Sequence, residues 1–324
     1  MKPVGTGTGR RRVLCRISAK VFFIYIQPGS YFKIMSDNIG KGLNSMNDIL
    51  IREMTERYTD KIRFIGSQHP VIRQVRHIRN NTSDDSERLL VAEGIWAQQI
   101  LLKKGFKINS LILCPELIFS REGIELAESL IERACEVFII SGRLFEKISE
   151  RDGPDGFVSV IQLPELNIEK LELGENALVM VLDGLEKPGN IGTIIRTCDG
   201  AGVDAVFLCN RKSRLTNPLL IKGSMGAVFT IPIVEFDNVR SCIDWLVSHH
   251  YNIFLADTKA EISYKSADYT GNTALVLGCE RYGISGDWYS SAPKLISIPM
   301  LGICDSLNVG VAASILAYEA ACFK

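Results

Sequence analysis

The chain has 324 residues, 46% of them hydrophobic, and its 37 basic and 37 acidic residues give a formal charge of +0. This length is sufficient for two domains with full cores. No run of about 18 apolar residues is present, which argues against a membrane protein. The nine cysteines form no CxxC pair. We therefore expect neither a metal site nor a disulfide framework, and the composition favours a reducing, cytoplasmic location.

The start of the chain differs in charge from the rest. Residues 1–36 contain seven lysines and arginines and no acidic residue. We expect residues 1–45 to be a disordered basic leader, and three interpretations stay open: an organellar transit peptide, an RNA-binding arm, or an extension upstream of a start at Met35 or Met46. "GTGTG" at 5–9 mimics a phosphate-binding loop, but no strand precedes it and no amphipathic helix follows it.

Residues 46–165 alternate helical and strand-like patterns. Segment 88–105 indicates a strand that runs into an amphipathic helix, and further strands are expected in "INSLILCP", "CEVFII" and "VSVIQL". "GIELAESLIERA" has the period of a helix, and "RDGPDGF" has the composition of a turn. This region is predicted to be a small α/β domain, and the charged residues 166–173 are predicted to be a linker.

Residues 174–324 have a more regular alternation. The sequence predicts six strands, separated by helical segments, at 177–185, 205–209, 230–236, 252–257, 273–280 and 295–300. Apolar strands that alternate with helices indicate a parallel sheet covered on both faces. Ligands bind such sheets beyond the carboxyl ends of the strands, which makes unusual residues at these ends candidates for function.

The first such cluster follows the strand at 177–185. Asn190 is placed to cap a helix from about residue 191, and Gly192 allows close backbone approach, so both fit a structural role equally well. Arg196 lies within that helix beside apolar neighbours. A solvated surface arginine is the common case, but a guanidinium beside a strand end can also bind a phosphate.

Two more polar clusters follow later strands. Glu280 ends the strand at 273–280, where a carboxylate is costly unless it is hydrogen-bonded. The last segment, "DSLNVGVAASILAYEAACFK", begins with polar residues although its helix is apolar on most sides. Asp305 or Ser306 is expected to cap this helix, which leaves Asn308 inside the first turn without a structural explanation.

The clusters form an ordered set of motifs: N-x-G-x-x-x-R from Asn190, G-x-E-x-x-G from Gly278, and I-P-M-x-G with S-L-N-V from Ile298. Together with "KGSMGA" at 222–227, this order resembles the SpoU family of RNA ribose 2′-O-methyltransferases in the SPOUT class. The resemblance covers 174–324, and residues 68–162 resemble more loosely the substrate-binding domain of many members. Lys187 and Gly310 depart from the pattern, since Asp and a small polar residue or Ala are usual there.

The resemblance implies a trefoil-knotted parallel-sheet methyltransferase domain preceded by a small α/β RNA-binding domain. It also implies S-adenosylmethionine as cofactor, no metal, and a homodimer through the C-terminal helix, whose apolar surface exceeds what one sheet face requires. The implied catalytic residues are Arg196, Asn190, Glu280, Ser306 and Asn308, and the implied cofactor-binding residues are Leu277, Gly278, Ile298, Met300, Leu307, Ser224 and Gly226.

The resemblance assigns removal of the ribose proton to Arg196. A guanidinium remains protonated at physiological pH, so we expect it instead to bind the RNA phosphate and stabilise the developing alkoxide. Asn190, Ser306 and Asn308 would position the ribose, and Glu280 would order Arg196 or Asn190.

The expected substrate is RNA, with ribosomal RNA favoured over transfer RNA by the extra N-terminal domain. Arg211, Lys212 and Arg214 in the loop "NRKSR" offer phosphate contacts, although a solvated loop is the simpler interpretation. Two alternatives stay open: a base methyltransferase of the same class, and a non-catalytic RNA-binding or ribosome-assembly factor of the same fold.

Overall fold

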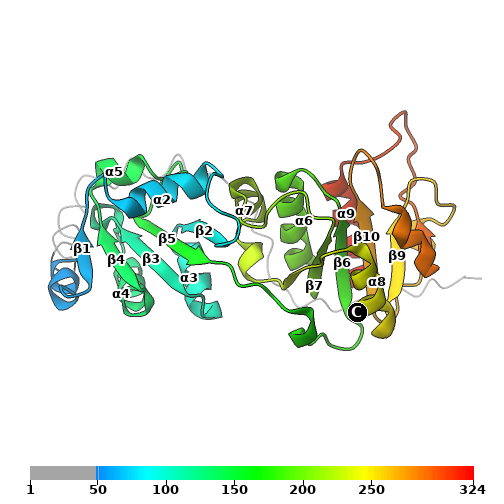
Figure 1. The fold of residues 1–324 in the computed structure, drawn as a ribbon, viewed down its shortest axis with the longest axis horizontal. Helices are drawn as coiled ribbons and strands as arrows, with labels where there is room; N and C mark the ends of the chain where they lie inside the picture. Colours follow the sequence, from blue (N-terminus) through cyan, green and yellow to red (C-terminus); the bar gives the residue numbers. More distant parts are fainter. Residues whose placement is uncertain (1–48, 50) are drawn as a thin grey trace, which may run out of the picture. The chain divides into compact units, whose positions relative to one another are not determined.

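The computed structural model describes residue 49 and residues 51–324 (Figure 1). Contacts within the chain group residues 46–324 into one unit. The expected leader at 1–45, with its "GTGTG" segment, lies outside the described residues. Across the part that is described, no helix is both long and apolar enough to cross a membrane.

The first half of the described chain contains a mixed five-stranded sheet in the order β1-β4-β3-β5-β2. β1, β4 and β3 run parallel, and β5 runs antiparallel to both of its neighbours, β3 and β2. The strands are β1 (Ile62–Phe64), β2 (Leu89–Glu93), β3 (Ile108–Leu113), β4 (Glu136–Ile139) and β5 (Phe157–Gln162). The expected α/β arrangement of this region is confirmed.

Helices cover both faces of this sheet (Figure 1). α2 (Pro70–Arg79) and α5 (Gly142–Glu146) pack on one face, and α3 (Ile95–Lys104) and α4 (Arg121–Arg133) pack on the other. α2 buries residues at helical spacing, Val71, Ile72, Val75 and Ile78. An amphipathic stripe of this kind fixes which side of the helix meets the sheet.

The second half contains a six-stranded sheet in which every pair is parallel, in the order β11-β9-β10-β6-β7-β8. The strands are β6 (Leu178–Asp183), β7 (Ala205–Cys209), β8 (Ile233–Glu235), β9 (Asn252–Ala256), β10 (Thr273–Gly278) and β11 (Lys294–Ile296). All six expected strands are present. β8 and β11 are shorter than expected; β8 starts directly after Pro232, which cannot donate a ladder hydrogen bond.

The central strand β6 is buried along its whole length, because both faces of this sheet are covered. α6 (Pro188–Ala201) and α9 (Val309–Ala321) pack on one face, while α8 (Val239–Ser248) and the short helix Gly286–Ser291 pack on the other. α7 (Pro218–Ser224) packs against α6. The doubly covered parallel sheet expected from the sequence is confirmed.

The segment expected to be a linker is packed. Residues Ile168–Lys170 form a short 3-10 helix, and Ile168, Leu171 and Leu173 lie against the core beside α8. The linker prediction followed from the many charged residues in this segment and overlooked the three apolar side chains that pack against the core. The boundaries 46–165, 166–173 and 174–324 stay predictions.

Candidate cofactor and catalytic site

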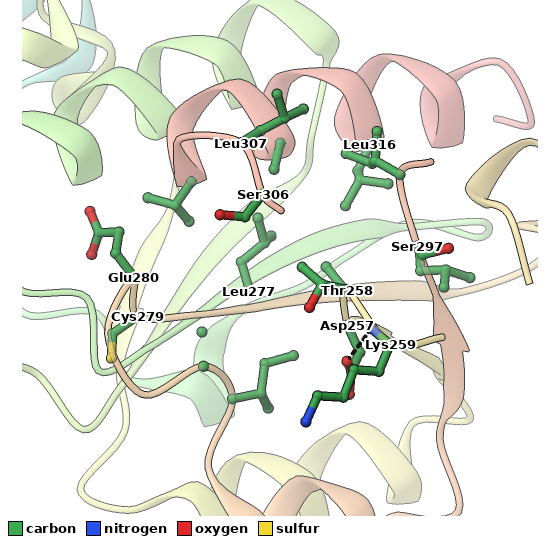
Figure 2. Close-up of a pocket in the computed structure, with 18 of the residues that line it drawn as sticks. Asp257, Thr258, Lys259, Leu277, Cys279, Glu280, Ser297, Ser306, Leu307 and Leu316 are labelled. Carbon is green, nitrogen blue, oxygen red and sulfur yellow. Dashed lines mark hydrogen bonds between the residues drawn. The ribbon is translucent and has the colours of Figure 1, made fainter. Parts of the chain in front are cut away.

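A cavity of about 480 Å³ lies where β9, β10 and β11 end. Loops that follow these three strands line it together with residues 305–307 and one side of α9; Asn308 does not line it (Figure 2). Glu280 and Ser306 lie toward one end of the cavity, and Asp257, Thr258 and Lys259 lie toward the other. Because the strands are parallel, their carboxyl ends bring these loops to one edge of the sheet.

Gly278 determines how tightly the loop after β10 folds. A Cβ added at Gly278 would lie 2.1 Å from the carbonyl carbon of Gly283, so a larger residue cannot be accommodated without moving the backbone. The loop is closed by hydrogen bonds in both directions between the backbones of Cys279 and Gly283, at 3.1 and 2.9 Å. The result is a cavity wall made of backbone, which can approach a ligand closely.

Five of the seven predicted cofactor-binding residues line this cavity: Leu277, Gly278, Ile298, Met300 and Leu307. Ser224 and Gly226 do not. Ser224 is buried at the end of α7, where its hydroxyl donates to the carbonyl oxygen of Ile221 at 2.8 Å and accepts from the backbone of Gly226 at 3.3 Å. Their assignment to the cofactor stays a prediction, and the geometry gives them a local role in the turn after α7.

Asn190 and Glu280 are brought together from residues 90 positions apart: the Asn190 side-chain amide donates a hydrogen bond to Glu280 Oε1. Two expectations need correction. α6 begins at Pro188 with Lys187 at the N-cap, so Asn190 lies inside the helix and does not cap it. Glu280 is exposed rather than buried, because the buried strand already ends at Gly278.

The start of α9 also differs from the expectation. The helix begins at Val309, and Asn308 is its N-cap, with Oδ1 accepting from the backbone of Gly310 at 2.9 Å. Asp305 and Ser306 do not cap; the Ser306 hydroxyl donates to Asp305 Oδ1 at 3.0 Å, and both residues line the cavity. Capping therefore explains Asn308 and leaves Ser306 facing the candidate site (Figure 2).

Arg196 lies on the exposed surface of α6 and has no hydrogen-bond or ion-pair partner among the described residues. α6 packs against α9, and the hydroxyls of Thr197 and Ser314 are 3.0 Å apart. Arg196 does not line the cofactor cavity. Its guanidinium is therefore available to a ligand outside that cavity.

The predicted RNA-contacting loop is largely occupied by internal contacts. Arg211 forms ion pairs with Asp85 at 3.0 Å and Glu235 at 3.1 Å, and Arg214 donates to Asn81 Oδ1 at 2.7 Å. Lys212 is exposed. The partner residues Asn81 and Asp85 are visible in the sequence, but nothing in the sequence shows that they lie beside this loop.

Two carboxylates at strand ends were missed. Asp257, just beyond β9, accepts from the Tyr289 hydroxyl at 2.7 Å and lines the cavity. Desolvation, and secondarily this hydrogen bond, raises the pKa of Tyr289 to about 12, so the phenol stays a donor. Buried Asp183 at the end of β6 accepts from Asn210 at 2.7 Å and from the backbone of Ser285 at 2.8 Å. Both could have been identified as candidates from the sequence, because each lies at or directly after the end of an apolar strand.

Among the described residues, no group of three or more His, Cys, Asp or Glu side chains could hold a metal ion. The donors and acceptors around the cavity are backbone groups, hydroxyls, separated carboxylates and the ammonium group of Lys259. The arrangement suits an organic ligand with apolar and polar parts.

Comparisons with known proteins match both halves of the chain. The model of the SpoU rRNA Methylase family matches residues 177–318, and the model of the MRM3-like substrate binding domain matches residues 69–159. The 23S rRNA (guanosine(2553)-2'-O)-methyltransferase RlmP of Bacillus subtilis is 30% identical over 189 residues, which cover 58% of this chain and 74% of that relative.

Another relative, the 23S rRNA (uridine(2479)-2'-O)-methyltransferase of Streptomyces viridochromogenes, is 25% identical over 247 residues, 75% of this chain and 85% of the relative. The crystal structure of an AdoMet-bound rRNA methyltransferase from Sinorhizobium meliloti superposes with a TM-score of 0.73 at 26% identity, covering 80% of this chain and 97% of that one. With the fold, the cavity and the motifs in agreement, the chain belongs to the SpoU rRNA methylase family.

Proposed function

We propose that this protein transfers a methyl group from S-adenosylmethionine to the 2′-hydroxyl of a ribose in ribosomal RNA. The observation that carries the proposal is the hydrogen bond between Asn190 and Glu280. It joins the helix that bears Arg196 to the loop after β10, at the rim of the cavity that suits the cofactor. Because the chain belongs to the SpoU rRNA methylase family, we interpret this arrangement as a methyl-transfer site.

The cavity fits the cofactor by its composition. Leu277, Ile298 and Leu316 provide apolar walls for a purine ring, and the tight turn at Gly278, which has no space for a Cβ, presents backbone to the ligand. Asp257 offers carboxylate oxygens to hydroxyl or ammonium groups. When bound there, S-adenosylmethionine would supply an electrophilic methyl group.

Arg196 serves the RNA rather than the cofactor. Its exposed guanidinium, without a partner in the described part of the chain, binds the phosphate next to the target ribose and stabilises negative charge on the attacking oxygen. Glu280 holds Asn190 in place, and Asn190 with Ser306 orients the ribose hydroxyl. Asn308 contributes chiefly by fixing the start of α9.

Ribosomal RNA is the proposed substrate because two relatives named for methylation of 23S rRNA match 75% and 58% of the chain, more than the methylase region alone. Residues 69–159, which match a substrate-binding domain, supply RNA contacts, and exposed Lys212 adds one phosphate contact. Transfer RNA is the alternative substrate. A non-catalytic assembly factor is the alternative from another class, and the intact Asn190–Glu280 pair argues against it.

The active form that we propose is a cytoplasmic homodimer built on α9, with the chain around the cavity threaded as a trefoil knot. Val311 and Tyr318 on α9 are 48% and 56% exposed, and Leu301 and Ile303 in the preceding loop are fully exposed. Apolar side chains so exposed are typical of a covered interface. Sedimentation of wild type and Tyr318→Glu tests this: a monomeric wild type contradicts the dimer.

The test of activity uses unmodified ribosomal RNA transcripts, unmodified transfer RNA and tritiated S-adenosylmethionine. We expect label in ribosomal RNA at one alkali-resistant dinucleotide, since 2′-O-methylation blocks hydrolysis at that position. Label in transfer RNA alone would replace the proposed substrate. Cofactor binding without label in either RNA would favour the assembly factor.

A further inference from the structure

A second cavity, of about 330 Å³, shares no lining residue with the cofactor cavity. Its walls come from α2, β2 and α3 on one side, and from α7 with the turn that follows it on the other. This turn carries the "KGSMGA" motif at 222–227, whose residues Ser224 and Gly226 do not reach the cofactor cavity. The motif therefore has a place in the structure that the methyl-transfer site does not explain.

Trp96 at the start of α3 forms the aromatic wall of this cavity. A Cβ added at Gly226 would lie 2.0 Å from Cζ3 of Trp96, so the indole occupies the space that any side chain at Gly226 would need. Trp96 nevertheless stays 53% exposed, whereas Trp288 is fully buried. An indole held against backbone with the rest of its surface exposed is suited to stacking on a planar ligand.

Arg79 supplies a hydrogen-bond donor that has no acceptor. Its side chain is 10% exposed and lines the cavity, and Nη2 donates to Glu93 Oε2 at 2.7 Å. Nη1 is buried and has no hydrogen-bond partner among the described residues. Glu93 accepts from the Ser149 hydroxyl and the backbone of Glu150 as well, but neither of its oxygens accepts from Nη1. A buried guanidinium N–H without an acceptor is costly, so a ligand acceptor there is favourable.

The charges around the cavity suit a ligand that carries phosphates. Lys222 and Arg151 line it as exposed or half-exposed cations beyond the buried Arg79–Glu93 pair. Glu150 also lines it, and Arg151 pairs with Asp155 at 3.8 Å, so Lys222 is the lining cation that has no ion-pair partner among the described residues. A nucleobase joined to a phosphate would fit this lining. Its ring can stack on Trp96, its acceptor atoms can accept from Nη1 of Arg79, and its phosphate can contact Lys222.

The cavity adjoins the helix that carries the catalytic residues. α7 lies between them, because Gly192 of α6 approaches α7 so closely that a Cβ at Gly192 would lie 2.3 Å from the carbonyl oxygen of Leu220. On its other side α7 gives Pro218, Ile221 and Lys222 to the cavity. A strand of RNA held here would be anchored to the same rigid helix pair that presents Arg196.

We propose that this cavity binds one unpaired nucleobase of the RNA substrate, stacked on Trp96 and accepting a hydrogen bond from Nη1 of Arg79. The proposal rests on the proposed function, since it takes RNA as the ligand. It adds a base-binding site separate from the methylated nucleotide. Single-stranded RNA is therefore preferred over a duplex, whose bases are stacked and paired.

The test measures binding of labelled RNA oligomers of about 12 nucleotides, oligo(A) and oligo(U), and of their duplex, to the full chain at one fixed salt concentration. Trp96→Leu keeps an apolar side chain but removes the stacking surface, and we expect it to weaken single-strand binding about fivefold or more. Trp96→Phe should stay within about threefold of wild type, since a smaller ring still stacks. RNA should quench tryptophan fluorescence in wild type and not in Trp96→Phe.

The matched control is Phe64→Leu, which changes an aromatic residue that is 73% exposed and lies outside this cavity. It should bind RNA as wild type does. Arg79→Lys keeps a cation opposite Glu93 and removes Nη1, and we expect it to weaken RNA binding. In the double variant with Trp96→Leu, the fold-loss of affinity should be smaller than the product of the two single losses, because both residues contact the same base. Thermal unfolding of each variant confirms that the fold is retained.

Equal affinity of Trp96→Leu and wild type for single-stranded RNA, or equal affinity of wild type for duplex, would overturn the proposal. If wild type methylates ribosomal RNA and Trp96→Leu binds RNA unchanged, the base-binding site alone fails. If wild type binds oligomers through Trp96 but methylates nothing, the proposed activity fails and the base-binding site stands. If wild type binds no RNA, both fail.

Discussion

The two sheets of this protein end their parallel strands in different ways. In the second sheet, carboxylates lie at or just beyond the ends of β6, β9 and β10: Asp183, Asp257 and Glu280. In the first sheet, β1, β3 and β4 end in Phe64, Leu113 and Ile139, beside a cavity of about 600 Å³. Glu116, which lines that cavity, accepts from the backbone of Gly142 at 3.1 Å.

The difference shows that a parallel edge alone does not make a reaction site. In the second sheet the polar groups are connected across loops, as in the Asn190–Glu280 and Asp257–Tyr289 hydrogen bonds. In the first half of the chain the buried charges form ion pairs: Arg79 with Glu93 at the end of β2, and Arg88 with Glu235 of β8 in the second sheet. The chemistry that we propose lies at the edge of the second sheet, and the substrate contacts that we propose lie in the first half of the chain.

Arg196→Ala gives the strongest test of that division. We expect kcat for methyl transfer to fall about 100-fold or more, because the guanidinium stabilises charge that develops in the transition state. Affinity for S-adenosylmethionine, measured by calorimetry, should stay within about threefold, since Arg196 lies outside the cofactor cavity. Arg196→Lys should restore little, because an ammonium lacks the bidentate fork.

The control for this variant is Arg240→Ala, which removes an exposed arginine of α8 whose only ion-pair partner in the described part of the chain is Asp244 on the same helix. It should methylate at the wild-type rate. A near-normal rate for Arg196→Ala would make Arg196 a solvated helix residue and remove the first motif from the mechanism.

Gly278→Ala tests the cofactor cavity itself. The added methyl group would lie 2.1 Å from the backbone of Gly283, so the loop must move and affinity for S-adenosylmethionine should fall about tenfold or more. Gly286→Ala is the matched control, because a Cβ there meets nothing within 4 Å and its φ is not positive. Equal affinities of the two variants would show that the cofactor does not bind at this turn.

Glu280→Gln sharpens the comparison within the second sheet. Loss of the charge weakens the hydrogen bond that orients Asn190, so single-turnover methyl transfer should slow about tenfold while the fold is kept. Asn190→Ala in the Glu280→Gln background should add little, since both act through one contact. Fully additive losses would show that the two residues act separately. Glu116→Gln in the first sheet should leave the rate unchanged.

Arg88→Ala addresses an ion pair between the residue before β2 and the last residue of β8, and it has the smallest expected effect on activity. Arg88 pairs with Glu235 and donates to the carbonyl oxygen of Leu163 at 3.2 Å, with both paired side chains largely buried. Its removal should lower the free energy of unfolding by about 2 kcal/mol, measured by urea titration. Arg121→Ala, which breaks an exposed pair, should cost under about 0.5 kcal/mol, and an equal loss would refute the distinction.

The strands and helices could be predicted because their signals are local. The apolar run of β6 and the helical spacing of Val71, Ile72, Val75 and Ile78 in α2 each contain the pattern of a buried element. The ends of elements were harder. Asn308 was placed inside α9 although it caps the helix, because Asp305, Ser306 and Asn308 are all residues that cap well.

The candidate site was partly predictable for the same reason. Gly278, Ile298, Met300 and Leu307 lie in motifs, Leu277 directly precedes one, and all five line the cavity. Ser224 and Gly226 lie in a motif as well, but their neighbours are Ile221 and Trp96 rather than the cavity. Asp257 lies in no motif and was missed. A motif marks a segment as unusual but does not say which cavity the segment lines.

The sequence by itself determined the α/β class, the six parallel strands of the second half and the residue types available for methyl transfer, because periodicity and motif spacing are properties of neighbouring residues. Only the tertiary structure decided which distant residues meet: Asn190 with Glu280, Arg211 with Asp85, and Trp96 with Gly226. These pairs are separated by 90 or more positions, and the packing of whole elements against one another sets their distances. The order of residue types along the chain does not specify how distant elements pack against one another.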